Sequence, residues 1–263
     1  MPPRTSPGAG SPRPDPRHPV LLHGFTGSAS SWEGVVDGLS AQGHVPVLVD
    51  LPGHGGNRGR HAPAQHTLDA ALALVRDAGR WPADLVGYSM GGRVALHFAA
   101  AHGGLVRRLV LESSSPGLET AEERAARRSS DEALAERLVA DGIRSFVAEW
   151  ETLPLFESQA GLSPDAVARQ RERRLSNDPP SLAAALRGLG AGALPSLWER
   201  LPRIAVPTLL VVGERDPKFV DIAARMSARM RSARTVVVPG AGHAVHLERP
   251  DLWLEVVGSF LGR

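Results

Sequence analysis

The most informative segment of the sequence is Leu85-Val86-Gly87-Tyr88-Ser89-Met90-Gly91-Gly92-Arg93. A short apolar strand, Leu85–Val86, leads into the pattern Gly-x-Ser-x-Gly, and a helical pattern over Met90–Ala101 follows it. The glycines allow a sharp turn, which leaves the serine hydroxyl at a helix N-terminus, where free N–H groups favour negative charge. A glycine-rich turn can arise by chance, but the flanking strand and helix favour a nucleophile at Ser89.

Short apolar runs recur along the chain after His18, each followed by a turn and a helical pattern. Their apolar character is continuous rather than alternating, which is typical of strands buried on both faces of a parallel sheet. The predicted strands are Val20–Leu22, Val45–Val49, Leu85–Val86, Leu105–Leu111, Thr208–Val212 and Thr235–Val238. The predicted helices are Ser31–Ala41, Thr67–Ala78, Met90–Ala101, Phe219–Met230 and Pro250–Leu261. This alternation predicts a mostly parallel, doubly wound α/β sheet.

Residues 116–203 break the alternation, because they contain helix signals and no strand. Thr120 with Glu123 forms a capping box, Asp131 is expected to open a second helix, and Ser163-Pro164 starts another. The remaining signals are the break at Asp141-Gly142, the pair Phe146 and Trp150, and the apolar set Leu182, Leu186 and Leu189. Because ligands bind at the C-terminal ends of parallel strands, an insertion here is well placed to cover them. We predict a helical lid over 116–203, inserted after a central strand of a core built from 18–115 and 204–263.

The first 17 residues hold six prolines and three arginines, and this composition predicts a disordered tail. No apolar segment follows those arginines, and no later apolar run is long enough to span a membrane. We therefore expect a cytoplasmic protein with no membrane partner.

The composition excludes several kinds of chemistry. With no cysteine in the chain, disulfides, thiolate metal sites and cysteine nucleophiles are all ruled out. Lys218 is the single lysine among 30 basic residues, so 29 are arginines. Aromatic residues make up 5% of the chain and the arginines alternate with acids, which argues against a nucleic-acid partner. Nothing in the sequence specifies an oligomeric state.

A serine nucleophile needs a base, and the base needs a group that orients it. Asp216 follows the predicted strand Thr208–Val212, and His243 follows Thr235–Val238. The order Ser…Asp…His is that of the α/β-hydrolase fold, and all three residues would emerge at one edge of the sheet. Glu214 and His246 compete for the acidic and basic roles. The three together predict a catalytic triad of Ser89, Asp216 and His243.

The loop after the first strand, which begins at His23-Gly24-Phe25, is expected to complete an oxyanion hole. In this fold one N–H comes from that loop and one from the residue after the serine. We assign these donors to Phe25 and Met90, and expect His23 to be structural. The loop Asp50-Leu51-Pro52-Gly53-His54-Gly55 is expected only to shape the pocket.

Three arginines near the predicted pocket indicate an anionic substrate. Arg93 lies one helical turn after Ser89, and Arg127 and Arg174 fall on predicted lid helices. Each alone could be an ordinary solvated arginine, paired for example with Glu123 or Glu172. As a set they favour a polycarboxylate held by charge-assisted hydrogen bonds. Tyr88 and Trp150 could supply an apolar wall, although Trp150 fits a lid core equally well.

Several segments together resemble the 2-succinyl-6-hydroxy-2,4-cyclohexadiene-1-carboxylate synthases of menaquinone biosynthesis. The similarity extends from about Pro19 to the C-terminus and includes the lid. Its segments are His23–Ser28, Asp50–Gly55, Gly87–Arg93, Ser115–Leu118, Trp150–Phe156, Pro195–Trp198, Gly213–Phe219 and Ala241–Glu248.

This resemblance implies a carbon–oxygen lyase rather than a hydrolase. Such enzymes remove a proton from the succinyl-enolpyruvyl cyclohexene precursor and expel pyruvate, with no metal or organic cofactor. The resemblance places Ser89, Asp216 and His243 in the triad. The substrate-contact positions it implies are Tyr88, Arg93, Arg127, Trp150 and Arg174.

Two features depart from the family pattern. The fold normally begins with a strand pair before Val20–Leu22, where this chain has its proline-rich tail. In the lid, Gly190-Ala191-Gly192 and Leu194 stand where a threonine and a polar residue are expected.

The alternative functions are those of a carboxylesterase or carbon–carbon bond hydrolase that acts on an anionic substrate, and of a binding scaffold without catalytic activity. Dehalogenases and epoxide hydrolases fit less well, because their nucleophile at this turn is an aspartate.

Overall fold

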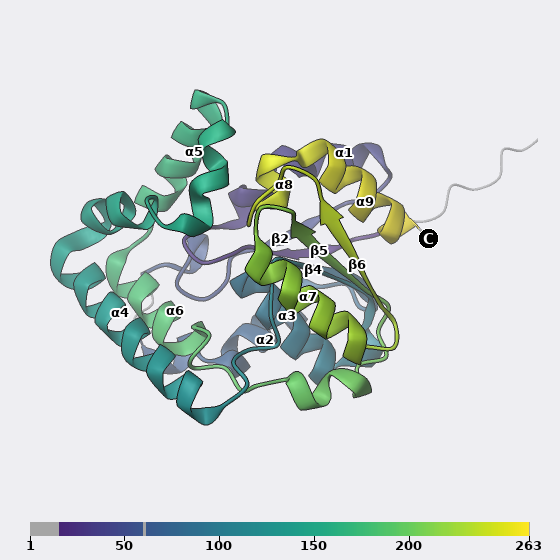
Figure 1. The fold of residues 1–263 in the computed structure, drawn as a ribbon, viewed down its shortest axis with the longest axis horizontal. Coiled ribbons are helices and arrows are strands. Elements are labelled where there is room, and N and C mark those ends of the chain that lie inside the picture. Colours follow the sequence, from purple (N-terminus) through teal and green to yellow (C-terminus); the bar gives the residue numbers. More distant parts are fainter. Residues whose placement is uncertain (1–15, 60–61, 263) are drawn as a thin grey trace, which may run out of the picture.

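The computed structural model describes residues 16–59 and 62–262, and its centre is a six-stranded sheet (Figure 1). The strand order is β2-β1-β3-β4-β5-β6, and every pairing among the described residues is parallel. The strands are β1 Val20–Leu22, β2 Val47–Val49, β3 Ala83–Tyr88, β4 Val106–Glu112, β5 Thr208–Gly213 and β6 Ala233–Val238. The predicted doubly wound parallel sheet is confirmed.

Helices cover both faces of this sheet, so each face has its own hydrophobic core (Figure 1). On one face lie α2 (Leu68–Ala78), α3 (Met90–Ala101) and α7 (Pro217–Arg229); on the other lie α1 (Glu33–Ala41), α8 (Val245–Glu248) and α9 (Pro250–Gly262). The largest fully buried side chains are Phe98 in the first core and Trp32 and Trp253 in the second. Burial on both faces explains why the strands are apolar without alternation.

The order in which successive strands join the sheet changes direction between β1 and β3, and this change determines where a site can form. From β1 the chain moves outward to β2, then returns to pair β3 with the other side of β1. The loops that follow β1 and β3 therefore diverge from adjacent strand ends, which is where open α/β sheets form a ligand crevice. One of these loops carries Phe25 and the other carries Ser89.

A helical insertion follows β4 and lies to one side of the sheet (Figure 1). Its helices are α4 (Ala121–Trp150), α5 (Pro164–Leu175) and α6 (Pro179–Leu189), with a 3₁₀ segment, Pro154–Gly161, after α4. The capping box is confirmed, since Thr120 accepts from the Glu123 N–H and the Glu123 carboxylate accepts from the Thr120 N–H. The predicted cap at Ser163 is also present.

The prediction that Asp131 opens a helix was wrong. Asp131 lies inside α4, and its carboxylate accepts from Arg127 one turn earlier at 2.7 Å, so it is not available as a cap. The break at Gly142 exists as a kink within α4, where φ is 77°. Neither this φ nor the ψ of 172° is helical, so α4 consists of two helices that meet at Gly142, and glycine tolerates the positive φ between them.

Several predicted element bounds also shift. β2 begins at Val47, because Pro46 has no N–H to donate to the ladder. β3 begins at Ala83, since the buried Asp84 is paired with Arg107 and Arg108 and so is tolerated in a strand. The first helix divides into a 3₁₀ turn, Ala29–Trp32, and α1. Helix α7 starts at Pro217 with Asp216 as its N-cap.

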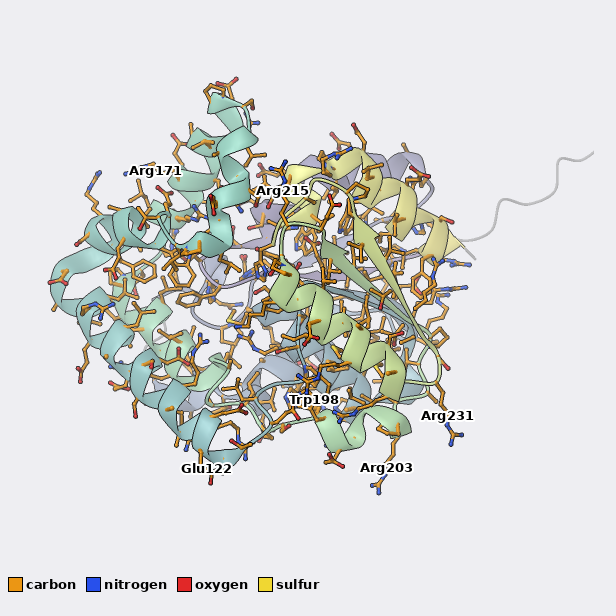
Figure 2. The ribbon with its side chains drawn as sticks, viewed as in Figure 1. Glu122, Arg171, Trp198, Arg203, Arg215 and Arg231 are labelled. Atoms are coloured by element: carbon orange, nitrogen blue, oxygen red, sulfur yellow. The ribbon has the colours of Figure 1, made fainter. Side chains whose placement is uncertain are left out.

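Residues 1–15, which include most of the predicted tail, lie outside the described residues. Within the described part no strand precedes β1, although Arg17 forms an isolated bridge with His44. Among the described residues, no helix has the length and apolar character needed to cross a membrane. Arginines such as Arg203 and Arg231 extend outward at the edge of the molecule away from α5 (Figure 2).

Candidate active site

The turn between β3 and α3 holds Ser89 in an unusual backbone conformation, with φ 51° and ψ −108°. Close packing around the turn explains the glycine pattern. A Cβ on Gly87 would lie 2.5 Å from the Gly91 carbonyl oxygen, and one on Gly91 would lie 2.3 Å from that of Leu22. Only glycine fits both positions, and the result is a partly exposed serine at the N-terminus of α3.

The structure brings the three predicted triad residues together. His243 Nδ1–H donates to Asp216 Oδ2 at 2.6 Å, and Nε2 lies 3.0 Å from Ser89 Oγ. Because a carboxylate can only accept, the proton is on Nδ1, and Nε2 is free to accept from the serine hydroxyl. Asp216 and His243 are both buried. This arrangement can deprotonate Ser89 and stabilise the resulting imidazolium.

The two competing residues have other partners. Glu214 is exposed, and its carboxylate accepts from the Gly240 N–H at 2.9 Å. His246 donates to the buried carboxylate of Glu112 at 2.7 Å, which also accepts from Trp253 Nε1 at 2.8 Å. Both therefore hold loops and core contacts in place around the site.

The two predicted oxyanion donors, Phe25 and Met90, both line one cavity with Ser89. Neither N–H has a protein acceptor among residues 16–59 and 62–262, so both are available to a ligand. His23 is structural, as expected, since its Nε2 accepts from the Leu51 N–H at 3.0 Å and Nδ1 donates to the Gly24 carbonyl. Asp50 fixes the neighbouring loop by accepting from Ala29 and Gly56 N–H groups.

The cavity has a volume of about 200 Å³ and lies between the sheet edge and the helical insertion. Trp150 has both of the roles considered from the sequence, in the pocket wall and in the core of the insertion. It lines the cavity, and its ring stacks on that of Phe146 with 5.4 Å between the ring centroids. Its buried indole N–H has no hydrogen-bond partner in the described chain, so it can donate to a ligand. Tyr88 lines the same cavity, and burial followed by the Glu112 charge raises its pKa well above the usual value, which keeps the phenol protonated.

All three predicted arginines line the cavity, but their surroundings differ. Arg93 has a buried Nε without a partner in the described part of the chain, and no carboxylate pairs with it there. Burial, and next the charge of Arg127, lower the pKa of Arg93 to about 10, so it remains a cation at neutral pH. The guanidinium is partly buried, and the nearby Asp131 charge offsets only part of these effects. A buried N–H donor without a partner is costly, which indicates a site completed by an anion.

Arg127 and Arg174 are already paired with protein carboxylates. Arg127 Nε lies 2.7 Å from Asp131, and one terminal nitrogen of Arg174 lies 3.2 Å from Glu151. The partners proposed from the sequence were wrong, since Glu123 caps α4 and Arg174 pairs with Glu151. The guanidinium carbon of Arg174 also lies over the Phe156 ring, 4.8 Å from its centroid. Burial lowers the pKa of Arg174, and Glu151 offsets part of that effect.

The family profile described as alpha/beta hydrolase fold matches residues 20–250. A Bacillus subtilis (strain 168) protein, provisionally named 2-succinyl-6-hydroxy-2,4-cyclohexadiene-1-carboxylate synthase, is 42% identical over 92% of this chain and 89% of its own. The Klebsiella pneumoniae (strain 342) protein of that name is 35% identical over 92% of each chain. The solved structure of MenH from S. aureus superposes with a TM-score of 0.86 at 35% identity, over 93% of both chains.

The chain belongs to this synthase family, within the α/β hydrolases. The sequence resemblance and the α/β-hydrolase fold are thereby confirmed. The site assignments of individual residues remain proposals that rest on the geometry above.

Three residues in or beside the cavity were given no site role from the sequence. Lys218 lines the cavity and forms no ion pair among the described residues. Glu248 accepts from the N–H groups of Gly242 at 2.6 Å and Ala244 at 3.2 Å, on both sides of His243. Asn177 joins the insertion to the Phe25 loop. Only the singular lysine carried a signal in the sequence.

The two lid glycines that depart from the family pattern permit close packing. A Cβ on Gly190 would lie 2.6 Å from Asp131 Oδ2, and one on Gly192 would lie 2.5 Å from the Arg128 backbone nitrogen. The turn after α6 therefore rests directly on α4. A threonine at either position would require one of these segments to move.

A pH effect on stability is expected from His54, which packs 4.9 Å from His23 beneath the Phe25 loop. Burial, followed by the His23 charge, lowers the pKa of His54 from 6.5 to about 3. The unfolded chain takes up this proton below about pH 6.5 while the folded chain does not, so stability is complete above that pH and falls toward pH 3. At pH 5 the loss is about 2 kcal/mol.

Urea unfolding at pH 7 and pH 5 measures this effect. His54→Asn keeps a polar atom near the Nδ1 position, which contacts the Pro52 carbonyl, and removes the titrating ring. We expect a smaller fall in the unfolding free energy for this variant than for the original chain. Equal falls in the two proteins would contradict the expectation.

Proposed function

We propose that this protein eliminates pyruvate from 2-succinyl-5-enolpyruvyl-6-hydroxy-3-cyclohexene-1-carboxylate, forming 2-succinyl-6-hydroxy-2,4-cyclohexadiene-1-carboxylate in menaquinone biosynthesis. The observation that carries the proposal is the unpaired Arg93 in the Ser89 cavity. A hydrolase of neutral esters gains nothing from an unpaired cation there, whereas a tricarboxylate substrate supplies its counter-charge. Synthase names among relatives 35% and 42% identical support the same reaction.

The triad serves this reaction as a base. His243 takes the hydroxyl proton of Ser89, and the serine oxygen removes a ring proton from the substrate. The electron pair left at C2 forms the C2=C3 double bond, the C3=C4 double bond moves to C4=C5, and the C5–O bond breaks. The enolpyruvyl group leaves with that bond's electrons, and protonation of its methylene carbon gives pyruvate. Phe25 and Met90 N–H groups stabilise negative charge that develops on the substrate.

Charge within the cavity supports a defined orientation of the carboxylates. Arg127 and Arg174 are partly neutralised by Asp131 and Glu151, while Arg93 and Lys218 have no such partners among the described residues. We assign the strongest carboxylate contact to Arg93, with Tyr88 and Trp150 packing against the ring.

The helical insertion, residues 116–203, acts as a lid in this proposal. It contributes Arg127, Trp150 and Arg174 to the cavity, so that it must be in place for the carboxylates to bind. A small-molecule substrate of this class also fits a cytoplasmic enzyme with no nucleic-acid or membrane partner.

A coupled assay tests the proposal. Enzymatically prepared precursor is supplied, and released pyruvate and the ultraviolet absorbance of the conjugated diene are followed together. We expect both to rise in step, well above the spontaneous rate. If neither rises while neutral esters are cleaved, the protein is an esterase and the proposal is wrong.

A further inference from the structure

The connection between α5 and α6 contains a buried asparagine with an unusual set of contacts. Asn177 is 7% exposed. Its side-chain Nδ2 group lies within hydrogen-bond distance of three backbone oxygens, at 3.0 Å from Thr26, 3.2 Å from Arg173 and 3.0 Å from Arg174. An amide group has two hydrogens, so one of them is shared between two acceptors.

Two of these oxygens belong to the last turn of α5, where backbone carbonyls have no partner within the helix. Arg174 is part of that turn, and its guanidinium lines the cavity. The Asn177 side chain therefore helps to close the end of the helix that carries this arginine, together with Ser176, whose N–H and hydroxyl also donate to the Arg173 carbonyl.

The third oxygen lies in the loop that supplies the Phe25 N–H. Thr26 follows Phe25 directly, is 5% exposed, and has φ 66°, which a threonine rarely adopts. Its carbonyl accepts a side-chain hydrogen bond from Asn177 and from no other described residue. The Asn177 amide thus hydrogen-bonds the insertion directly to the backbone of the strained oxyanion loop, beside the ring contacts of Phe25 with Phe146 and Trp150.

We propose that Asn177 is a positioning residue that couples the seating of α5 to the geometry of the oxyanion loop. When α5 is in place, the amide holds Thr26, and Thr26 fixes the direction of the preceding N–H. Without the amide, the Thr26 carbonyl is buried and unpaired, and the loop can relax from its strained conformation. The inference rests on the proposed function only for the identity of the substrate.

Two substitutions separate this role from simple closure of the helix. Asn177→Ala removes all three hydrogen bonds. Asn177→Ser keeps a short donor that can reach a carbonyl one turn back, such as that of Arg173, but not the Thr26 oxygen across the interface. Arg58→Ala is the matched control, because Arg58 donates to the Ser176 carbonyl beside Asn177 without touching the oxyanion loop.

The readout is the rate at which a neutral fluorophosphonate labels Ser89, followed by mass spectrometry. This reaction needs the triad and the oxyanion hole but not the arginines. We expect Asn177→Ser and Asn177→Ala to slow labelling by about tenfold, a fraction of the effect of losing an oxyanion donor outright. Arg58→Ala should stay within about twofold of the original chain. Pyruvate release should show a lower kcat in both Asn177 variants, and a raised KM chiefly in Asn177→Ala.

The outcomes distinguish the two proposals. Labelling of the serine variant at the original rate would show that Asn177 only closes α5, and would overturn the inference. Because that variant keeps the helix end intact, it remains informative if Asn177→Ala fails to fold. If the fluorophosphonate labels the original protein but no pyruvate is released, the proposed function is wrong and the proposed coupling through Asn177 is unaffected. If the original protein is not labelled at all, the proposed coupling is wrong as well.

Discussion

Replacement of Ser89 by alanine is expected to lower the rate of pyruvate release by about 10³-fold or more, because a positioned base contributes up to about 10⁴-fold. The His243 imidazole lies 3.0 Å from Ser89 Oγ and is oriented by Asp216. Without the hydroxyl, this base has no oxygen to activate. The measurement is kcat for pyruvate release with saturating precursor, together with a melting curve for the variant.

Ser89→Gly provides a matched comparison, since it also lacks the hydroxyl but tolerates a positive φ. With φ 51° at this position, we expect the glycine variant to melt at a higher temperature than the alanine variant while both are inactive. The comparison then separates the effect of backbone strain on the melting temperature from the effect of losing the hydroxyl on activity. Retention of most activity by either variant would remove Ser89 from the catalytic role.

The elbow and the sheet could be predicted because their signals are local. The Gly-x-Ser-x-Gly pattern lies within five residues, and Gly87 must be a glycine because it lies against the Gly91 and Gly92 backbone of the same turn. The reason for Gly91 is a carbonyl at the end of β1, that of Leu22, but its position in the pattern is still local. The continuous apolar runs indicate strands that are buried on both faces of the sheet. Asp216 and His243 could be placed for the same reason, since each comes shortly after a strand and parallel strands end at the same edge of the sheet.

Contacts between distant segments could not be predicted in this way. Asn177 meets Thr26 across 151 positions, and Arg174 pairs with Glu151 across 23. Neither spacing corresponds to a helical or strand period, so no pattern in the sequence indicates these pairs. Asp131 shows the converse error, because a residue type that often caps helices is here an ion-pair partner inside one.

The same distinction applies to the arginines. The sequence places Arg93, Arg127 and Arg174 near the pocket but cannot tell which of them is neutralised. The structure separates them, because Asp131 and Glu151 partner two, while Arg93 Nε is buried without a partner among the described residues. We therefore expect Arg93 to make the strongest electrostatic interaction with an anionic ligand.

Replacement of Arg93 is accordingly expected to have the second large effect. Removing one partner of a buried charge pair costs about 2–5 kcal/mol, so Arg93→Met should lower kcat/KM for the precursor by about 10²-fold or more. In the ligand-free protein, however, the cation is partly buried, forms no ion pair among the described residues, and has a buried Nε without a partner. An apolar side chain of similar length should then raise the melting temperature while it lowers activity.

Arg137→Ala is the control for this experiment. Arg137 lies on the outer face of α4, pairs with Glu149 at 3.3 Å and is half-exposed, so its loss changes the net charge without changing the cavity. Kinetics on the precursor, fluorophosphonate labelling of Ser89 and melting curves are measured for both variants. We expect Arg93→Met to lose precursor turnover but to label normally, and Arg137→Ala to match the original protein in all three. If Arg93→Met turned over the precursor normally, the substrate would not be bound through this cation, and the cavity would have to recognise it through Arg127, Arg174 and Lys218 instead.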